Sequence, residues 1–555
     1  MPPILASNLP QALAQAVILW DSIPKLLVAT LRALNSLATS WASLLFALPN
    51  GSHASFPDQI LTKPVIQTLI AILLQSPSSP LGTRQIELAA DLITHCCVSD
   101  VSRNLLVKEG LLDTLGDVLA SFALSTASSS HNPASPRSPM HSSIHHVLDA
   151  LSAIVEGSNY RTHRLVYSPS LKRVLAGTKE RTFYDDTQGP NFSLHQKLSH
   201  AISVENLLPQ IMIQKTVSFG SHAFPSLSLA SSRLLAEQAV MDSPTSSPLC
   251  VWLIHLARSL PAPSSQLAAL RLLALVSNAL DADSSGLFPD MVPKSRERER
   301  QIALLAVPIA VRLVADSTDA LACMVHGRDE YLAVKNESCA VLALLIQNNV
   351  ELQKAAHSAG AHKHIAQLLR KSFEPITLAR PMWSPQLQSS EIPTPPSSTT
   401  TLGEGNLSRE VVDALKVRAG ALKAVAAVSE RDDPIRKDLI DAGVAAYIID
   451  SLTPFPDVGT SSSTSSYQAK DGNTVPVILA ACQAATAMSR SVGNLRTSLI
   501  DAGLGKPVFA LLKHPDNRVQ IAATDVSINL VLDFSPMREV RAGYTGRYIC
   551  MLTET

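Results

Sequence analysis

The chain has 555 residues, of which 46% are hydrophobic and only 4% aromatic, so its core must be assembled mainly from Leu, Ala, Val and Ile side chains. This composition favours helices packed on helices and argues against an all-β sandwich. Lys and Arg together number 46 and balance 46 Asp and Glu, which leaves no basic excess for binding nucleic acid.

The N-terminal segment lacks the features of a secretory signal. No basic residue precedes Lys25, and Asn8, Pro10 and Gln11 interrupt the apolar run. No stretch reaches the roughly 18 uninterrupted apolar residues that a membrane span requires. The seven cysteines form no Cys-x-x-Cys pair and mostly lie in apolar helical contexts, so we expect reduced core thiols. We therefore expect an intracellular protein with no membrane partner.

Short repeated motifs indicate a solenoid. LIDAG occurs at 439–443 and at 499–503, and similar apolar runs end at Gly110 and Gly360. Each run is followed by a second short apolar run and then by a longer one. The longer runs lie at 145–155, 411–428, 477–492 and 519–534. We interpret the unit as a short helix ended by a glycine in the left-handed conformation, a second helix, and a longer third helix.

Three polar tracts, at 122–141, 372–407 and 453–474, interrupt this pattern. They are rich in Ser, Thr and Pro and show no helical periodicity, so we predict disordered insertions. Each follows a second helix and precedes a third. Without them, the repeat glycines are spaced close to the armadillo period of about 40 to 47 residues. The sequence therefore predicts an all-α, armadillo-type α-solenoid whose insertions lie along one rim.

The predicted domain boundaries follow from the repeats and the insertions. We expect armadillo-like repeats at 1–121, 142–371, 408–452 and 475–537, and an aberrant tail at 538–555. In the middle part we expect helices at 226–241, 250–259, 264–280 and 299–315, whereas 168–193 shows no clear period.

Two local features sharpen these expectations. The helix at 519–534 is apolar nearly all round, so neighbouring helices should cover it on several sides. Asp433 should be an N-cap, with Pro434 at the first helical position.

The motifs SRSV, LRTSLIDAG and NLVLDFSPM lie within 481–537, and RQIELAADLI (84–93) and ELQKAAHSAGAHKHIAQLL (351–369) precede them. These segments resemble the armadillo-repeat subunit of the GID/CTLH ubiquitin ligase, especially its fungal form. The resemblance implies a non-catalytic scaffold that links a substrate-receptor subunit to the RING/LisH-CTLH core, in cytoplasm and nucleus. The family continues past FSPM with further repeats, so we expect this C-terminus to be truncated.

A peptide-carrying adaptor of the nuclear-import or catenin type is the alternative. The groove of the import receptor is lined by a Trp-x-x-x-Asn ladder, and none of the four tryptophans here has an asparagine four residues later. Only Asn529 occupies a ladder-like place, because Ala487 and Ala427 stand at the aligned positions of the two preceding third helices. This pattern favours docking of a folded partner or of a partner's tail.

The predicted partner-binding residues are Asp525, Asn529 and Asp533, with Gln483 in the preceding third helix. Asp525 and Asp533 lie one turn on either side of Asn529 and share its helical face. If Asn529 faces the concave surface, as the resemblance suggests, a basic or hydrogen-bonding segment of a partner would dock there. In the alternative interpretation Asp533 merely ends the helix and Asp525 points to solvent.

No catalytic, cofactor or metal site is predicted, and we expect no enzyme. The chain has no Gly-x-Ser-x-Gly motif, and GLGKP at 503–507 lacks the first glycine and the Ser/Thr of a phosphate loop. Histidines cluster at 141–146 and at 357–364. No Cys or carboxylate stands near them at metal-ligand spacing, so we interpret them as loop and cap residues.

Overall fold

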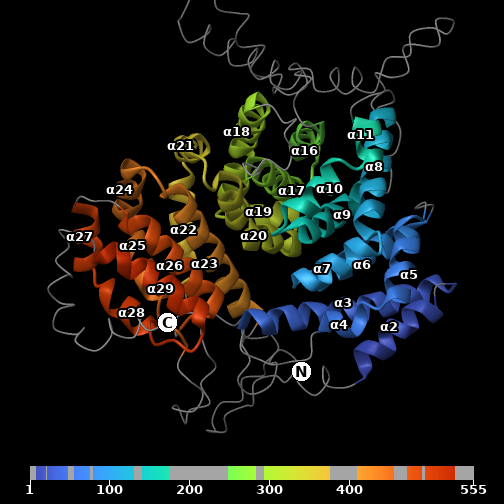
Figure 1. Ribbon diagram of the computed structural model, residues 1–555, viewed down its shortest axis with the longest axis horizontal. Coiled ribbons are helices and arrows are strands. Elements are labelled where there is room, and N and C mark those ends of the chain that lie inside the picture. Colours follow the sequence, from blue (N-terminus) through green and yellow to red (C-terminus); the bar gives the residue numbers. More distant parts are fainter. Residues whose placement is uncertain are drawn as a thin grey trace, which may run out of the picture. The chain divides into compact units, whose positions relative to one another are not determined.

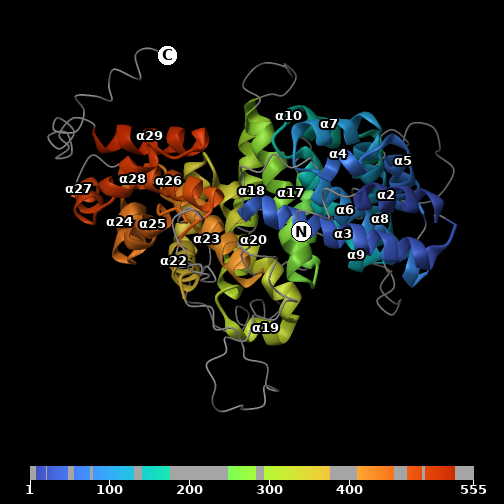
Figure 2. The same ribbon diagram turned by 90° about the horizontal axis from the view of Figure 1, so that it is seen from below.

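The computed structural model describes residues 8–20, 22–47, 56–75, 79–129, 140–175, 248–282, 293–374, 409–455, 472–490 and 494–531. All regular elements within these ranges are helices, apart from one isolated bridge between Pro454 and Asn473 (Figures 1 and 2). None of these helices is both long and apolar enough to cross a membrane. The chain divides into two compact units, one of residues 2–41 and 53–310 and the other of 311–555 with 1 and 42–52.

The first unit is built entirely from helices among its described residues, and several of them begin at side-chain caps. Its elements are α2 (Leu9–Leu19), α3 (Pro24–Ala47), α4 (Phe56–Ile60), α5 (Lys63–Leu73), α6 (Pro80–Cys96), α7 (Asp100–Lys108), α8 (Leu111–Ser129), α9 (Met140–Val155), α10 (Asn159–Val166), α11 (Pro169–Leu175), α16 (Pro248–Ser259) and α17 (Pro263–Ala282). Ser79 caps α6, and Ser99 and Ser102 form a capping box on α7. The long helices α6, α9 and α17 pack in that order. The short α7 and the 19-residue α8 follow α6, and the short pair α10/α11 follows α9.

The division between the units falls within α18 (Pro293–Asp316), and residues 42–47 at the end of α3 are also assigned to the second unit. The second unit then contains α19 (Ala320–His326), α20 (Arg328–Ile346), α21 (Val350–Ser358), α22 (Ala361–Lys371), α23 (Arg409–Val428), α24 (Asp433–Asp441), α25 (Val444–Ser451), α26 (Val475–Ser489), α27 (Asn494–Asp501), α28 (Gly505–Leu511) and α29 (Asn517–Leu530). The long helices α20, α23, α26 and α29 each pack against the next (Figures 1 and 2). The short pairs α21/α22, α24/α25 and α27/α28 connect them, which confirms the predicted three-helix repeats of an armadillo-type solenoid.

The repeat glycines adopt the left-handed conformation that the sequence predicts. The φ angles are +90° at Gly110, +82° at Gly360, +77° at Gly443 and +95° at Gly503. A Cβ atom built at any of these positions would meet nothing within 4 Å. The need for glycine is therefore conformational rather than steric, because only the backbone angle excludes a side chain.

Several element boundaries differ from the expectation. Helix α8 continues to Ser129 with Phe122 and Ala123 buried, so it takes up the first part of the predicted insertion at 122–141. The N-cap of α24 is Asp432 rather than Asp433, and the Asp433 carboxylate instead accepts a hydrogen bond from Arg436. The expected helix at 226–241 lies outside the described residues, whereas α16, α17 and α18 confirm the other three helices expected in the middle part.

The third helix of the last repeat, α29, is less covered by neighbouring helices than the sequence suggests. α29 ends at Leu530 and buries one face, through Val519, Ala523, Val526 and Leu530. Ile521 and Ile528 are 64% and 52% exposed. The expectation that neighbours cover this helix on several sides is therefore wrong.

The ends of two predicted insertions belong to the folded structure. Ser372 and Asn473 are buried, and the Phe455 amide donates to the Asn473 carbonyl across 3.3 Å. A Cβ atom at Gly472 would lie 2.6 Å from Phe455 Cα, so the two ends of the third tract meet closely enough to require glycine. The predicted boundaries at 372 and at 453–474 therefore include residues that the fold needs.

Candidate interaction surface

Asn529 connects α29 to the helix beneath it. Its Nδ2 group donates to the Thr486 carbonyl at 3.1 Å and to Ser489 Oγ at 3.4 Å, both in the last turn of α26. The last carbonyls of a helix have no partner within that helix, so this side chain satisfies one of them. Asn529 thus helps to hold two successive third helices together, which leaves its amide group engaged within the fold.

The other predicted partner-binding residues lie in different surroundings. Asp525 on α29 and Gln483 on α26 are exposed, whereas Asp533 lies outside the described residues. Cys482 is buried beside Asp525, and burial together with that negative charge raises the pKa of its thiol to about 12. The structure therefore places Asp525 and Gln483 where a partner could reach them, and their role in binding stays a prediction.

The sequence analysis did not predict the apolar side chains that are exposed on this surface. Ile521, Asp525 and Ile528 follow the i, i+4, i+7 spacing of one helical face, and all three are exposed. We call these three residues the α29 face. This face carries two large exposed apolar side chains on either side of a carboxylate, where the sequence analysis expected an acidic stripe.

A buried polar side chain reaches back from the first helix of each repeat in the second unit. Gln353 Nε2 donates to the Ile346 carbonyl at 3.4 Å, Arg436 Nε to the Ser429 carbonyl at 2.8 Å, and Arg496 Nε to the Ser489 carbonyl at 3.1 Å. Each acceptor lies at the C-terminal end of the preceding long helix. Each donor also stands seven residues before the repeat glycine, a regularity that the sequence contains and that pattern reading missed.

Arg418 in α23 joins the ends of the two insertions of the second unit. It is fully buried, donates to the Ser372 carbonyl at 2.8 Å and to Asn473 Oδ1, and lies 3.5 Å from the ring centroid of Phe373. Burial lowers the pKa of this guanidinium to about 10, against the opposing effect of Asp450. The junctions α22/α23 and α25/α26 are therefore neighbours, as expected of two insertions on one rim.

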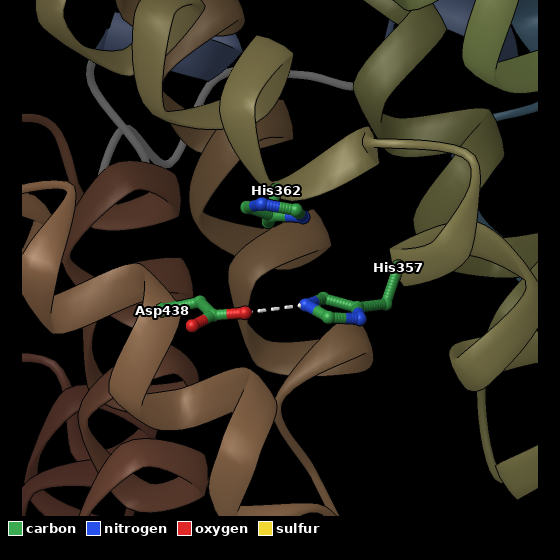
Figure 3. Close-up of side chains that lie close together, drawn as sticks. All are labelled: His357, His362 and Asp438. Atoms are coloured by element: carbon green, nitrogen blue, oxygen red, sulfur yellow. Dashed lines mark hydrogen bonds and ion pairs between the residues drawn. The ribbon is translucent and has the colours of Figure 1, made fainter.

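The histidine clusters have carboxylate partners that sequence spacing did not reveal. His146 hydrogen-bonds to Asp91 of the preceding long helix. His357 Nε2 donates to Asp438 Oδ2 at 2.7 Å, and its ring lies 4.5 Å from that of His362 (Figure 3). The expectation that no carboxylate lies near these histidines is wrong, because a neighbouring repeat supplies it: an earlier helix for His146 and the following repeat for His357.

Comparison with known proteins shows that part of the chain is similar in sequence to two kinds of protein. No family model matches. The chain is homologous to GID complex subunit 5 of Schizosaccharomyces pombe, 31% identical over 245 residues that make up 44% of this chain and 26% of the relative. It is also homologous to armadillo repeat-containing protein 8 of Mus musculus, 28% identical over 239 residues, 42% of this chain and 30% of the relative. The matched part thus spans less than a third of either relative.

Solved structures include distant likenesses. A designed armadillo repeat protein is 16% identical, with a TM-score of 0.28, over 50% of this chain and 98% of its own. A second engineered protein also gives 16% identity and a TM-score of 0.28, over 94% of this chain and 98% of its own. TM-scores this low do not establish a shared fold. The fold assignment therefore depends on the helix packing within this chain.

Proposed function

We propose that this chain is a non-catalytic scaffold subunit of a GID/CTLH-type ubiquitin ligase, which links a substrate-receptor subunit to the RING/LisH-CTLH core in cytoplasm and nucleus. The homology to GID complex subunit 5 is the observation that carries the proposal. The stacked three-helix repeats support it, because such repeats offer an extended surface that can hold several partners at once.

The cysteines of the described residues support a role without ubiquitin transfer. A thioester-forming enzyme needs an accessible thiolate. Cys96, Cys97, Cys250, Cys339 and Cys482 are buried, and only Cys323 is partly exposed. Burial raises the pKa of Cys339 to about 12, so this thiol stays protonated at neutral pH.

The position of Asn529 disfavours the alternative of a peptide-carrying adaptor. In that class an asparagine ladder must present free amide groups to the bound peptide backbone. Asn529 is the single ladder-like residue found in the sequence, and its Nδ2 group donates to Thr486 and Ser489 within the fold. We therefore favour docking of a folded partner on exposed side chains such as Asp525 and Gln483.

Reconstitution with purified subunits tests the proposal. The full chain is mixed with a GID/CTLH substrate receptor and, separately, with the RING/LisH-CTLH core, and each mixture is resolved by size-exclusion chromatography. We expect co-elution with both, and no autoubiquitination by the chain alone with E1 and E2. Failure to bind either subunit, or autoubiquitination by the isolated chain, would show that the proposed function is wrong.

A further inference from the structure

Three side chains with metal-binding atoms converge where two successive repeats of the second unit meet. His357 lies in the last turn of α21, His362 in the first turn of α22, and Asp438 in α24 of the following repeat (Figure 3). One nitrogen from each histidine and one carboxylate oxygen all lie within 4.8 Å of one another. The left-handed turn at Gly360 brings the two histidines together, because it reverses the chain between the helices that carry them.

The existing contacts leave this group incompletely satisfied. His357 Nε2 donates to Asp438 Oδ2, so a proton now joins two atoms that could both bind a cation. Nδ1 of His362 is buried and makes no hydrogen bond. An unpaired buried polar atom is costly, and a bound ion is one of the standard explanations for it. A bound ion would give this nitrogen a partner, but not Nδ1 of His364, which is likewise buried and unpaired and lies outside the group.

The group is also open to solvent. His357 and Asp438 are only half-buried, so a water molecule can reach the group from solvent.

We propose that His357, His362 and Asp438 bind one Zn²⁺ ion, with water as the fourth ligand. Two imidazoles and one carboxylate with an open position form a common zinc ligand set, and imidazole ligands favour zinc over Mg²⁺ or Ca²⁺. Zinc bonds of about 2.0 to 2.2 Å require the three atoms to draw closer than they lie now. The ion would join α21 and α22 to α24 and so fasten one repeat to the next.

Zinc titration of the full chain tests this site. After removal of metals with a chelator, we expect isothermal titration calorimetry to show one Zn²⁺ per chain with micromolar or tighter affinity. We also expect Co²⁺, which takes the same ligands, to give the visible absorption of a four-coordinate site. His357→Ala and His362→Ala should each weaken binding at least about tenfold. Asp438→Asn, which keeps the side-chain shape, should weaken it likewise. Zinc should raise the melting temperature of the wild-type chain and not that of these variants.

His364→Ala is the matched control, since His364 lies on the same helix but outside the group, and it should bind zinc like the wild type. Circular dichroism identifies any variant that fails to fold, in which case Asp438→Asn decides. A folded wild-type chain that takes up no zinc at 100-fold excess over protein would overturn the proposal. Equal binding by the wild type and His362→Ala would do so too, and would leave a simple hydrogen-bonded pair. Neither result bears on assembly with ligase subunits, because the proposed function does not depend on the metal.

Discussion

At the residue scale, the most important buried polar contacts are the side-chain hydrogen bonds to carbonyls at the C-terminal ends of the long helices. Arg436 is almost fully buried, and besides the Ser429 carbonyl it bonds to the Glu430 carbonyl at 2.6 Å. Truncation would leave the buried Ser429 carbonyl and the partly buried Glu430 carbonyl without this donor, and loss of a donor to a buried carbonyl costs about 1 to 3 kcal/mol. We expect Arg436→Ala to lower the free energy of unfolding by about 2 to 3 kcal/mol, measured by urea denaturation.

Arg436→Gln is the control for that loss. Gln353 occupies the equivalent place one repeat earlier and reaches the Ile346 carbonyl, so glutamine is long enough for one of the two bonds. The glutamine variant should recover roughly half of the lost stability. Equal destabilisation by alanine and glutamine would mean that the loss comes from packing of the guanidinium rather than from its hydrogen bonds.

Histidine burial predicts how stability depends on pH. Burial, and then the Arg258 charge, lower the pKa of His255 in α16 below its ordinary value. The folded state therefore resists protonation more than the unfolded chain does, so stability is full above the ordinary histidine pKa near 6.5 and falls as the pH drops below it. We expect the melting temperature of the first unit to be lower at pH 5.5 than at pH 7.5. His255→Gln should reduce this difference, and an unchanged difference would assign it to other groups.

At the scale of a single element, the glycine turn between the first and second helices of each repeat is the most important feature. At Gly443 the φ angle is +77° and the space beside the Cα atom is open, so only backbone strain opposes a side chain. We expect Gly443→Ala to cost about 1 to 2 kcal/mol in thermal or chemical denaturation, and Gly443→Asn clearly less, because asparagine tolerates left-handed angles. A neutral alanine variant would contradict the assignment of this turn.

The insertion between α25 and α26 provides a test of where an element ends. Deletion of 457–470 with a short Gly-Ser closure keeps Phe455 and Gly472, whose backbones already meet, and it keeps Asn473 bonded to Arg418. We expect this deletion to change the melting temperature little. Deletion of 453–474 should destabilise the last repeats strongly, because it removes Asn473, whose side-chain oxygen accepts a hydrogen bond from the buried Arg418. Equal melting temperatures of the two deletions would show that the Asn473 anchor is dispensable.

At the scale of the whole molecule, sequence periodicity predicts the repeats but not the side-chain contacts between one repeat and the next. The glycines and long helices follow from local patterns, which is why α23, α26 and α29 lie near the expected positions. Contacts such as His357 with Asp438 join residues from different repeats, and no local pattern encodes them. An apolar sequence also does not show whether a neighbouring helix covers each face of a helix. For this reason the sequence did not predict the exposure of Ile521 and Ile528 on α29.

The α29 face is where this chain should meet a ligase subunit, if the proposed function holds. Asp525 and Ile528 are exposed and contribute little to the core, whereas Asn529 holds α29 to α26 and is a poor choice for mutation. We expect Asp525→Lys combined with Ile528→Ser to weaken binding of the receptor or the core by about 2 kcal/mol, roughly thirtyfold in Kd, with little change in melting temperature. Asp441→Lys, at an exposed position of α24, makes the same charge change elsewhere in the unit and should leave binding intact. The measurement is calorimetric titration with each purified subunit. Unaltered affinity of the double variant for both subunits would move the interface to other repeats, while equal weakening by Asp441→Lys would reduce the effect to net charge.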